Sequence, residues 1–353
     1  MKISYMMKRE SFYKINEKTL MKFFPKSNEK SRLYIYPELN AIIRKRPAGE
    51  VKKYLYTEFH VKSAWYKRLL VWFYTRICLN TFGLLSSKRI DIDANISEDI
   101  LIYPCNRKYR IFDFSKETVS VVVKYGFPNH CLKREIDFRV NNSDCEFISP
   151  IVEHSDFCYT EKIIKGVPLA RISKNYDELK RDALKIWSDF AAKTKKTVSS
   201  QEYAKTLSEQ AEKLKQRIKK KDKKIDFELL EDVFEKLLGK LSKSGESVDV
   251  MLSHGDLQEG NIWIEDDTNK IYIIDWESVL ERSAWYDNAV LYDGIRNGAN
   301  FCKFCTTHSL EHVTVAAEEV IYRMDELCEL PEDYGTDDFN NFIKKLSESI
   351  KNV

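Results

Sequence analysis

The sequence predicts an α+β protein in which a small antiparallel sheet precedes a mainly helical region. Short runs rich in β-branched and aromatic residues, at 99–103, 109–114 and 118–125, follow one another with short turns between them, as the strands of an antiparallel sheet do. Beyond residue 176, apolar residues recur at three- and four-residue spacing, which is typical of helices that bury one face. With 353 residues, the chain is long enough to bury a full core.

Composition narrows the class of protein. Hydrophobic residues make up 43% of the chain and charged residues 32%, as in an ordinary globular protein, and the net charge of +3 is too small to indicate nucleic-acid binding. Eight cysteines are scattered along a chain that opens without a secretory apolar segment. We therefore expect reduced thiols, a cytoplasmic protein and no nucleic-acid partner.

Residues 1–97 form an amino-terminal extension to which the sequence assigns no role. Residues 32–44 predict a strand and a short helix. Residues 69–87 form an apolar segment that approaches the length of a membrane span, but Arg76 near its middle would cost roughly 2.5–3.5 kcal/mol in a bilayer. We expect a buried or lobe-covering helix; an interfacial helix held by its Trp, Tyr and Arg residues is the first alternative and a span the second.

The valine-rich strand at 118–125 ends in Lys124, which needs an anionic partner if its side chain turns inward. The next acidic residue is Glu135, and Asp137 follows closely; their segment fits both strand and helix spacing. The loop at 104–108 contains no glycine.

Three helical stretches follow residue 176, the second opened by a capping box at Ser199 and the third capped by Asp226. Between the second and third stretches, residues 213–224 hold eight basic residues and one acidic residue. A solvated helix end is the simpler interpretation, and docking to an anionic membrane or polymer is the alternative.

The stretch from 252 to 277 contains the candidate chemistry. Residues 262–265 predict a strand, 266–269 a turn and 270–274 a returning strand, so Asn261 and Asp275 should meet at the open end of a hairpin. An amide oxygen and a carboxylate are hard ligands that suit Mg²⁺. Asp256, on the glycine-containing turn just before this hairpin, is placed to accept a proton from an attacking hydroxyl. This arrangement is that of phosphoryl transfer.

The motif His-Gly-Asp-Leu-x-x-x-Asn from His254 to Asn261, followed by Ile274-Asp275-Trp276-Glu277, resembles the aminoglycoside phosphotransferase and choline kinase group of small-molecule kinases, relatives of the protein kinases. Protein kinases carry Arg where Gly255 stands and Asp-Phe-Gly where 275–277 stand, and these differences favour a small-molecule acceptor. The resemblance implies a two-lobed protein-kinase-like fold with an antiparallel-sheet N-lobe and hinge at 98–165 and a mainly helical C-lobe at 166–353.

The resemblance also implies roles for the C-lobe residues. The reaction would move the γ-phosphoryl group of ATP to a hydroxyl of a small molecule or saccharide, with Asp256 as base and Asn261 and Asp275 holding Mg²⁺. Asp287 would cap a helix or clamp the catalytic loop. For Glu277, contact with a second Mg²⁺ and a plain hydrogen-bonding role both stay open.

In the N-lobe, the resemblance implies that Lys124, paired with a helical glutamate, grips the nucleotide phosphates. This favours Glu135, with Asp137 as the reserve. Asn106 and Arg107, in the loop without glycine, would contribute to nucleotide binding, with Arg107 or Lys108 supplying charge where a glycine-rich loop would offer backbone N–H groups. Residues 157–164 resemble the hinge strand that binds adenine through its backbone.

Two alternatives of other kinds stay open. One is a catalytically silent nucleotide-binding module, and the other is a kinase at an anionic membrane surface that acts on a lipid or envelope saccharide. An antibiotic acceptor would need a carboxylate-rich pocket and choline an aromatic cage, for which the candidates are Trp276, Trp285, Tyr286 and Tyr292. The acceptor and the oligomeric state are not predicted.

Overall fold

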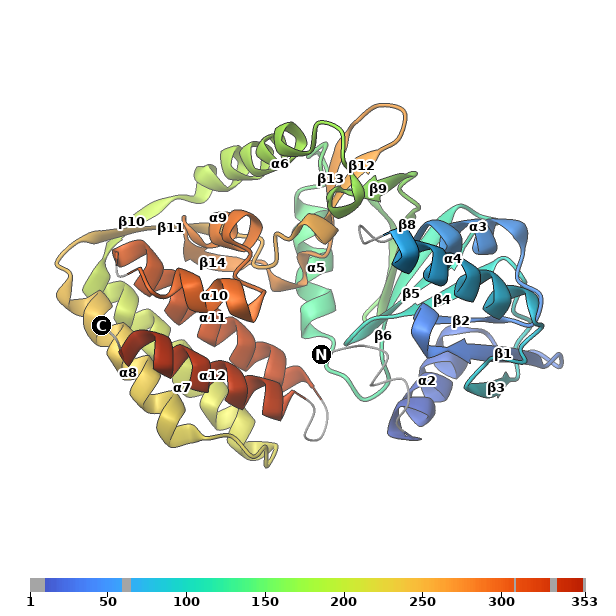
Figure 1. Cartoon of the computed structure of the whole chain (residues 1–353), viewed down its shortest axis with the longest axis horizontal. Coiled ribbons are helices and arrows are strands. Elements are labelled where there is room, and N and C mark those ends of the chain that lie inside the picture. Colours follow the sequence, from blue (N-terminus) through green and yellow to red (C-terminus); the bar gives the residue numbers. More distant parts are fainter. Residues whose placement is uncertain (1–9, 59–64, 308, 331–334, 352–353) are drawn as a thin grey trace. The chain divides into compact units, whose positions relative to one another are not determined.

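The computed structural model describes residues 10–58, 65–307, 309–330 and 335–351. The chain divides into two compact units, Met1–Val167 and Pro168–Val353. The expected protein-kinase-like α+β class is confirmed: the first unit is built on an antiparallel sheet and the second is mainly helical (Figure 1).

The sheet of the first unit has eight strands, all paired antiparallel, in the order β3-β1-β2-β4-β5-β6-β8-β7. The strands are β1 (Ser31–Tyr36), β2 (Ala41–Arg44), β3 (Lys88–Ile92), β4 (Ile100–Pro104), β5 (Lys108–Asp113), β6 (Thr118–Val123), β7 (Ile151–His154) and β8 (Cys158–Lys162). The three strands expected at 99–125 are β4, β5 and β6, and the expected hinge strand contains β8.

The amino-terminal extension supplies three strands of this sheet. Its β2 pairs with β4, with Ile42 opposite Ile102. The short helix expected at 32–44 is a single 3-10 turn (Pro37–Leu39), and the second strand that follows it, β2, was not expected. Ile42 and Ile43 are buried and β2 is hydrogen-bonded on both sides, which favours a strand for these β-branched residues.

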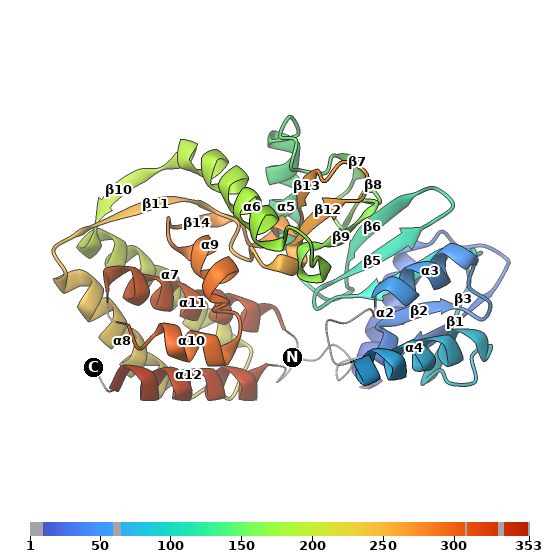
Figure 2. The same cartoon turned by 45° about the horizontal axis from the view of Figure 1, so that its top comes forward.

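The helices of the first unit are α2 (Glu10–Phe23), α3 (Gly49–Glu58), α4 (Trp65–Asn80) and α5 (His130–Asn141). Helices α3 and α4 lie side by side (Figures 1 and 2) and contribute Val51, Leu55, Cys78 and Leu79 to a cluster with residues of β1, β2, β4, β5 and β6. Within the part of the chain that the structure describes, no helix is both long and apolar enough to cross a membrane.

The second unit begins within β9 (Gly166–Pro168). It contains a three-stranded antiparallel sheet, β10 (Lys196–Ser199), β11 (Ser247–Ser253) and β14 (Leu280–Ser283), and the hairpin β12 (Ile262–Glu265) and β13 (Ile271–Ile273). The helices are α6 (Tyr176–Ala191), α7 (Ser200–Lys220), α8 (Phe227–Lys243), α9 (Tyr286–Asn288), α10 (Gly298–Phe304), α11 (Leu310–Glu329) and α12 (Thr336–Lys351).

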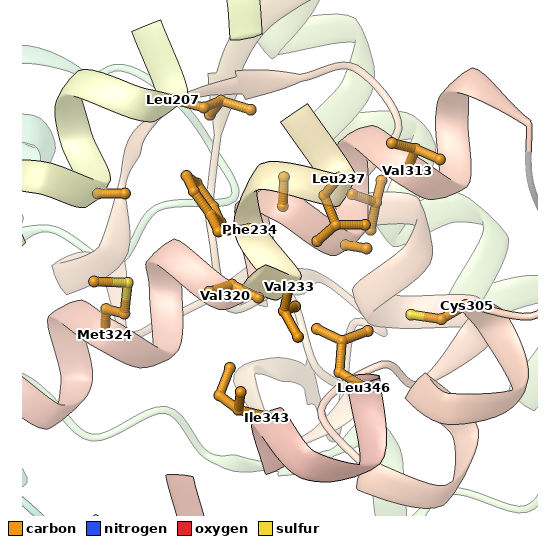
Figure 3. Close-up of a cluster of buried hydrophobic side chains, with 14 of the residues drawn as sticks. Leu207, Val233, Phe234, Leu237, Cys305, Val313, Val320, Met324, Ile343 and Leu346 are labelled. Carbon is orange, nitrogen blue, oxygen red and sulfur yellow. The ribbon is translucent and has the colours of Figure 1, made fainter. Parts of the chain in front are cut away.

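The core of the second unit lies among α7, α8, α11 and α12 (Figure 3). Each of these helices contributes to the core, for example through Leu207 of α7, Phe234 of α8, Val320 of α11 and Ile343 of α12. The expected helix starts are confirmed, because the Ser199 side chain accepts a hydrogen bond from the backbone N–H of Glu202 and the Asp226 side chain accepts one from Leu229. All eight cysteines lie in the described part of the chain and are free thiols, as expected.

Candidate active site

The turn that carries Asp256 follows strand β11 and requires glycine at position 255. Gly255 has a φ of +81°, and a Cβ there would lie 2.4 Å from the Ser278 carbonyl oxygen and 2.5 Å from an Arg282 guanidinium nitrogen. An arginine, or any other side chain, at position 255 would therefore collide with this backbone and with Arg282 of β14.

Asp287 clamps this turn from α9. Its buried carboxylate accepts hydrogen bonds from the Ser253 hydroxyl (2.9 Å), from the backbone N–H groups of His254 (2.8 Å) and Gly255 (3.0 Å), and from the Trp187 indole N–H (2.7 Å). Four donors to one carboxylate fix the backbone just before Asp256. The clamp role that the sequence analysis gave as one alternative is confirmed.

His254 joins the turn to the end of the hairpin. Its Nδ1 accepts from the Asp256 backbone N–H (3.2 Å), so Nε2 carries the proton and donates to the Ile274 carbonyl (3.1 Å). The ring is fully buried and lies 4.6 Å from the Trp276 ring, centroid to centroid. Burial lowers the pKa of His254, which keeps the imidazole neutral.

The hairpin brings Asn261 and Asp275 to its open end. Ile262 pairs with Ile273, and the Ile274 backbone N–H donates to the Asn261 carbonyl (2.9 Å). Asp275 follows at once, with a left-handed backbone (φ 72°, ψ 55°), a conformation that aspartate tolerates better than most residues.

Asn261 also touches Asp256. Its side-chain nitrogen donates to the Asp256 carbonyl (2.8 Å) and carboxylate (3.1 Å). The structure therefore gathers Asp256, Asn261 and Asp275 at one end of the hairpin, as the fold-back of the chain predicted. Their roles as base and metal ligands stay predictions.

Two further residues hold the Asp256 carboxylate, and the sequence analysis missed both. The Gln258 amide nitrogen lies 2.7 Å and the Arg296 Nε 3.1 Å from the same carboxylate oxygen, and Arg296 also bonds to the Gly255 carbonyl and to Glu319. Gln258 stands within the recognised motif, so its spacing was a usable signal. Arg296 stands 40 residues beyond Asp256 in a segment without a motif.

In the first unit, Lys124 is buried at the end of β6. Its ammonium donates to the backbone carbonyls of Cys105 (2.5 Å) and Asn106 (3.1 Å), and burial lowers its pKa to about 7. Lys124 thus holds the glycine-free loop at 104–108 by its backbone. In that loop, the Arg107 side chain lies 3.1 Å from the Cys131 sulfur of α5.

Glu135 lies on helix α5 and is completely buried, whereas Asp137 on the same helix is exposed. Its carboxylate pairs with the Lys108 ammonium of β5 (3.2 Å) and accepts from the Tyr159 hydroxyl (2.8 Å). Glu135 is therefore the inward acidic residue of the two. Lys108, considered from the sequence only as a possible charge for the phosphates, is a second buried lysine at this place. The pairing of Glu135 with Lys124 stays a prediction.

Comparison with known proteins agrees with this arrangement. Residues 158–290 match the family model described as choline/ethanolamine kinase. No curated protein matches the chain significantly. A thermostable mutant of aminoglycoside phosphotransferase APH(4)-Ia is 12% identical, with a TM-score of 0.50, over 72% of this chain and 94% of that one.

Two choline kinases are also similar. The enzyme of Cryptosporidium parvum Iowa II is 14% identical, with a TM-score of 0.43, over 73% of this chain and 91% of its own. LicA of Streptococcus pneumoniae is 13% identical, with a TM-score of 0.42, over 72% of this chain and 92% of its own.

The family match includes the turn at Asp256 and the whole hairpin, and the likeness to the aminoglycoside phosphotransferase shows the fold. The resemblance to small-molecule kinases of the protein-kinase-like fold is thereby confirmed.

Proposed function

We propose that the chain transfers the γ-phosphoryl group of ATP, with Mg²⁺, to a hydroxyl of a small molecule or saccharide. The observation that carries this proposal is the gathering of Asp256, Asn261 and the hairpin end that leads into Asp275 by direct hydrogen bonds. Phosphoryl transfer needs a carboxylate beside oxygen ligands for a divalent cation, and this set supplies both.

The donor atoms fit magnesium. Asn261 donates its amide nitrogen to Asp256, which leaves its amide oxygen as the atom available to a cation, and Asp275 adds a carboxylate. These are hard oxygen ligands, few in number, as Mg²⁺ prefers. A bound Mg²⁺ would neutralise the phosphate oxygens of ATP. Whether Glu277 contacts a second ion is left open.

Asp256 is suited to receive the proton of the acceptor hydroxyl. Its side chain keeps 20% of its surface exposed, so a substrate can reach it. Gln258 and Arg296 orient the carboxylate from one oxygen, and Asn261 approaches the other. A positioned base of this kind contributes typically 10²–10⁴-fold, roughly, to a reaction rate.

Nucleotide binding is proposed for the first unit. Lys124, paired with Glu135, would bind the nucleotide phosphates. Asn106 and Arg107 would contribute from the loop that Lys124 holds. Lys108, paired with Glu135, joins these candidates because its ammonium is already directed at that carboxylate.

The aromatic residues considered for a choline cage do not act as a set. Trp276 and Tyr286 are completely buried, and their polar atoms bond to the Ile273 carbonyl (2.9 Å) and to Glu319 (2.9 Å). These two belong to the core, which is the commoner place for aromatic residues at such spacing, so they do not line a cage with Trp285 and Tyr292. The proposal therefore names the acceptor only as a hydroxyl compound.

A screen of acceptors with a catalytic variant tests the proposal. We expect the purified chain to form ADP from Mg-ATP with at least one member of a panel of aminoglycosides, amino alcohols and sugars. Asp256→Asn should reduce this turnover by about 100-fold or more. Asp266→Asn, in the exposed turn of the same hairpin, is the matched control and should leave it unchanged.

Two outcomes would contradict the proposal. Turnover that survives both Asp256→Asn and Asp275→Asn would show that the hairpin end does not carry the chemistry. Magnesium-dependent ATP binding without ADP formation for any acceptor would instead favour the silent nucleotide-binding module.

A further inference from the structure

Helix α4 exposes a wide apolar face. Eight large residues on it are exposed, among them Trp65 at 71% and Leu70 at 66%; the others are Tyr66, Leu69, Trp72, Phe73, Tyr74 and Ile77. At 100° per residue, all eight fall within about 200° of the helix circumference. A helix of a globular protein normally turns such a stripe toward the core.

The core-facing side of α4 is a different one. Thr75, Cys78 and Leu79 are buried, and the last two belong to the cluster that α4 shares with α3 and the sheet. These three residues lie on the side of the helix roughly opposite the exposed stripe. The helix thus has two apolar sides, of which one is covered by the described part of the chain.

The turn after α4 extends the exposed surface. Phe82, Leu84 and Leu85 are exposed, Leu84 at 80%. Between the first two, Gly83 has a φ of +87°, and a Cβ there would lie 2.2 Å from the Tyr34 ring. The turn is therefore held in place by β1 and presents its leucines outward from a fixed backbone.

The charge of the segment that carries this surface has one sign, although Glu38 of the preceding 3-10 turn accepts a hydrogen bond from the Tyr74 hydroxyl (3.4 Å). No acidic residue occurs between Glu58 and Asp91, whereas six basic residues do, in a chain whose overall balance is 58 basic to 55 acidic residues. Arg46 lies over the Phe82 ring (5.3 Å) and Arg76 over the Trp72 ring (3.9 Å). Arg68 and Arg89 are exposed nearby in the sequence.

We propose that this α4 surface, formed by the exposed residues of 65–85 with Arg46, Arg68 and Arg89, docks on an anionic lipid membrane. Helices that bind the headgroup layer of a membrane carry exposed leucine, tryptophan and tyrosine residues together with arginine. Each basic residue near an anionic surface adds about 1 kcal/mol to the binding free energy. The helix would lie on the membrane surface and would not span the bilayer. A symmetric contact between two copies would instead set the same basic residues against one another.

The basic run at 213–224 does not offer a comparable site. Arg217 pairs with Asp325 (3.2 Å) and Glu329 (2.5 Å), Lys215 pairs with Glu231 (2.9 Å), and Lys223 is buried. Much of its charge is used within the second unit, and no exposed aromatic residue interrupts it. The membrane contact considered from the sequence therefore fits the α4 surface better.

Vesicle sedimentation of the full chain tests the proposal. We expect binding to phosphatidylcholine vesicles that contain about a quarter phosphatidylserine, and little binding to phosphatidylcholine alone. Leu70→Ser/Leu84→Ser should reduce binding about tenfold or more, since each change removes exposed apolar surface that the membrane would bury. Leu280→Ser, at an exposed leucine of the second unit, is the control and should bind normally.

A charge variant makes the test independent of the apolar one. Arg68→Glu/Arg89→Glu should lose binding to the anionic vesicles, whereas Lys219→Glu/Lys220→Glu should retain it. Absence of vesicle binding, or equal binding by the leucine variant, would overturn the proposal. So would a dimer of the wild type in sedimentation equilibrium that the leucine variant dissociates, because the occupant of the surface would then be a second copy. None of these readouts depends on kinase activity.

Discussion

Lys108 and Lys124 are buried next to each other in the first unit, and their contacts give them different functions. Lys108 stands opposite Val123 in the sheet and forms an ion pair with the completely buried Glu135. Lys124 follows that strand position directly and donates to the carbonyls of the loop at 104–108. One lysine thus compensates a buried carboxylate, and the other supports a loop.

Replacement of each lysine by methionine separates these functions. Lys108→Met removes the nearer cation of Glu135 and leaves Arg139 (3.8 Å) beside it, so we expect the free energy of unfolding to fall by about 3 kcal/mol. Lys124→Met replaces an ammonium, whose pKa burial lowers to about 7, by an apolar group of similar length. It should cost about 1 kcal/mol, because the loss of two hydrogen bonds to the loop is offset by the removal of a buried charge. Urea unfolding of both variants measures the difference.

ATP kinetics of the same pair tests the nucleotide role. If both ammonium groups serve the phosphates, each variant loses about 100-fold in kcat/KM for ATP, although only Lys108→Met is markedly destabilised. A reversed order of stabilities would show that Glu135 depends on Lys124 instead.

The two lysines also show how far single residues were predictable. Lys124 and Glu135 were found because each stands at a recognisable place, the end of a valine-rich strand and the next acidic residue. The pair of Lys108 with Glu135 was missed because the two residues stand 27 positions apart, and the register of β5 decides which side chain turns toward α5. No local pattern in the sequence carries that register.

Helices and strands, like single residues, were predictable where their signal is local and were missed where it depends on distant parts of the chain. The hairpin of β12 and β13 was predictable because alternating β-branched residues and the intervening polar turn are local signals. Strand β2 was not predicted, because it is placed between β1 and β4, and β4 stands about 60 residues further along the chain. Helix α4 was predicted, but not which of its two apolar sides the rest of the unit covers.

The turn between β11 and β12 depends on Asp287 more than on its own residues. We expect Asp287→Asn to lower the free energy of unfolding by about 3 kcal/mol and to abolish most turnover, because an amide places a donor against N–H and O–H groups that donate. Urea unfolding and ADP formation measure the two effects.

Trp187→Phe is the control for this prediction. It removes one of the four donors to Asp287 and leaves the three that come from the turn itself. A smaller loss of stability, with turnover largely kept, is expected. Equal effects of the two variants would mean that Asp287 acts through the tryptophan and not through the turn.

At the scale of the whole molecule, the amino-terminal extension belongs to the first unit's sheet. Strands β3, β1 and β2 continue the sheet beyond β4, and α3 and α4 pack on the residues that this extension buries. The sequence analysis left residues 1–97 unassigned because they match no motif, and because pairing between distant strands has no local signature. The extension also carries the α4 surface. It therefore completes the sheet of the first unit and supplies the surface proposed to bind a membrane.

Stability as a function of pH gives the last prediction, through His254. Burial holds the pKa of this imidazole below its ordinary value of 6.5, against the opposing charges of Asp287, Asp256 and Asp275. As pH falls below 6.5, the unfolded chain binds a proton that the folded chain does not, so the unfolded state is stabilised relative to the folded state. The contribution of His254 to stability is therefore complete above pH 6.5 and declines below it, by at most about 1.4 kcal/mol per pH unit.

Unfolding by urea between pH 7.5 and 5.5, followed by tryptophan fluorescence, measures this dependence, because Trp187 and Trp276 contact the His254 ring. His254→Gln should be less stable at pH 7.5 but should lose less on acidification than the wild type, since glutamine does not titrate. His154→Gln, at an exposed histidine of β7, should follow the wild type. If His254→Gln and the wild type lose equal stability, the buried imidazole does not govern the acid response, and its neutral form is not what joins the Asp256 turn to the hairpin.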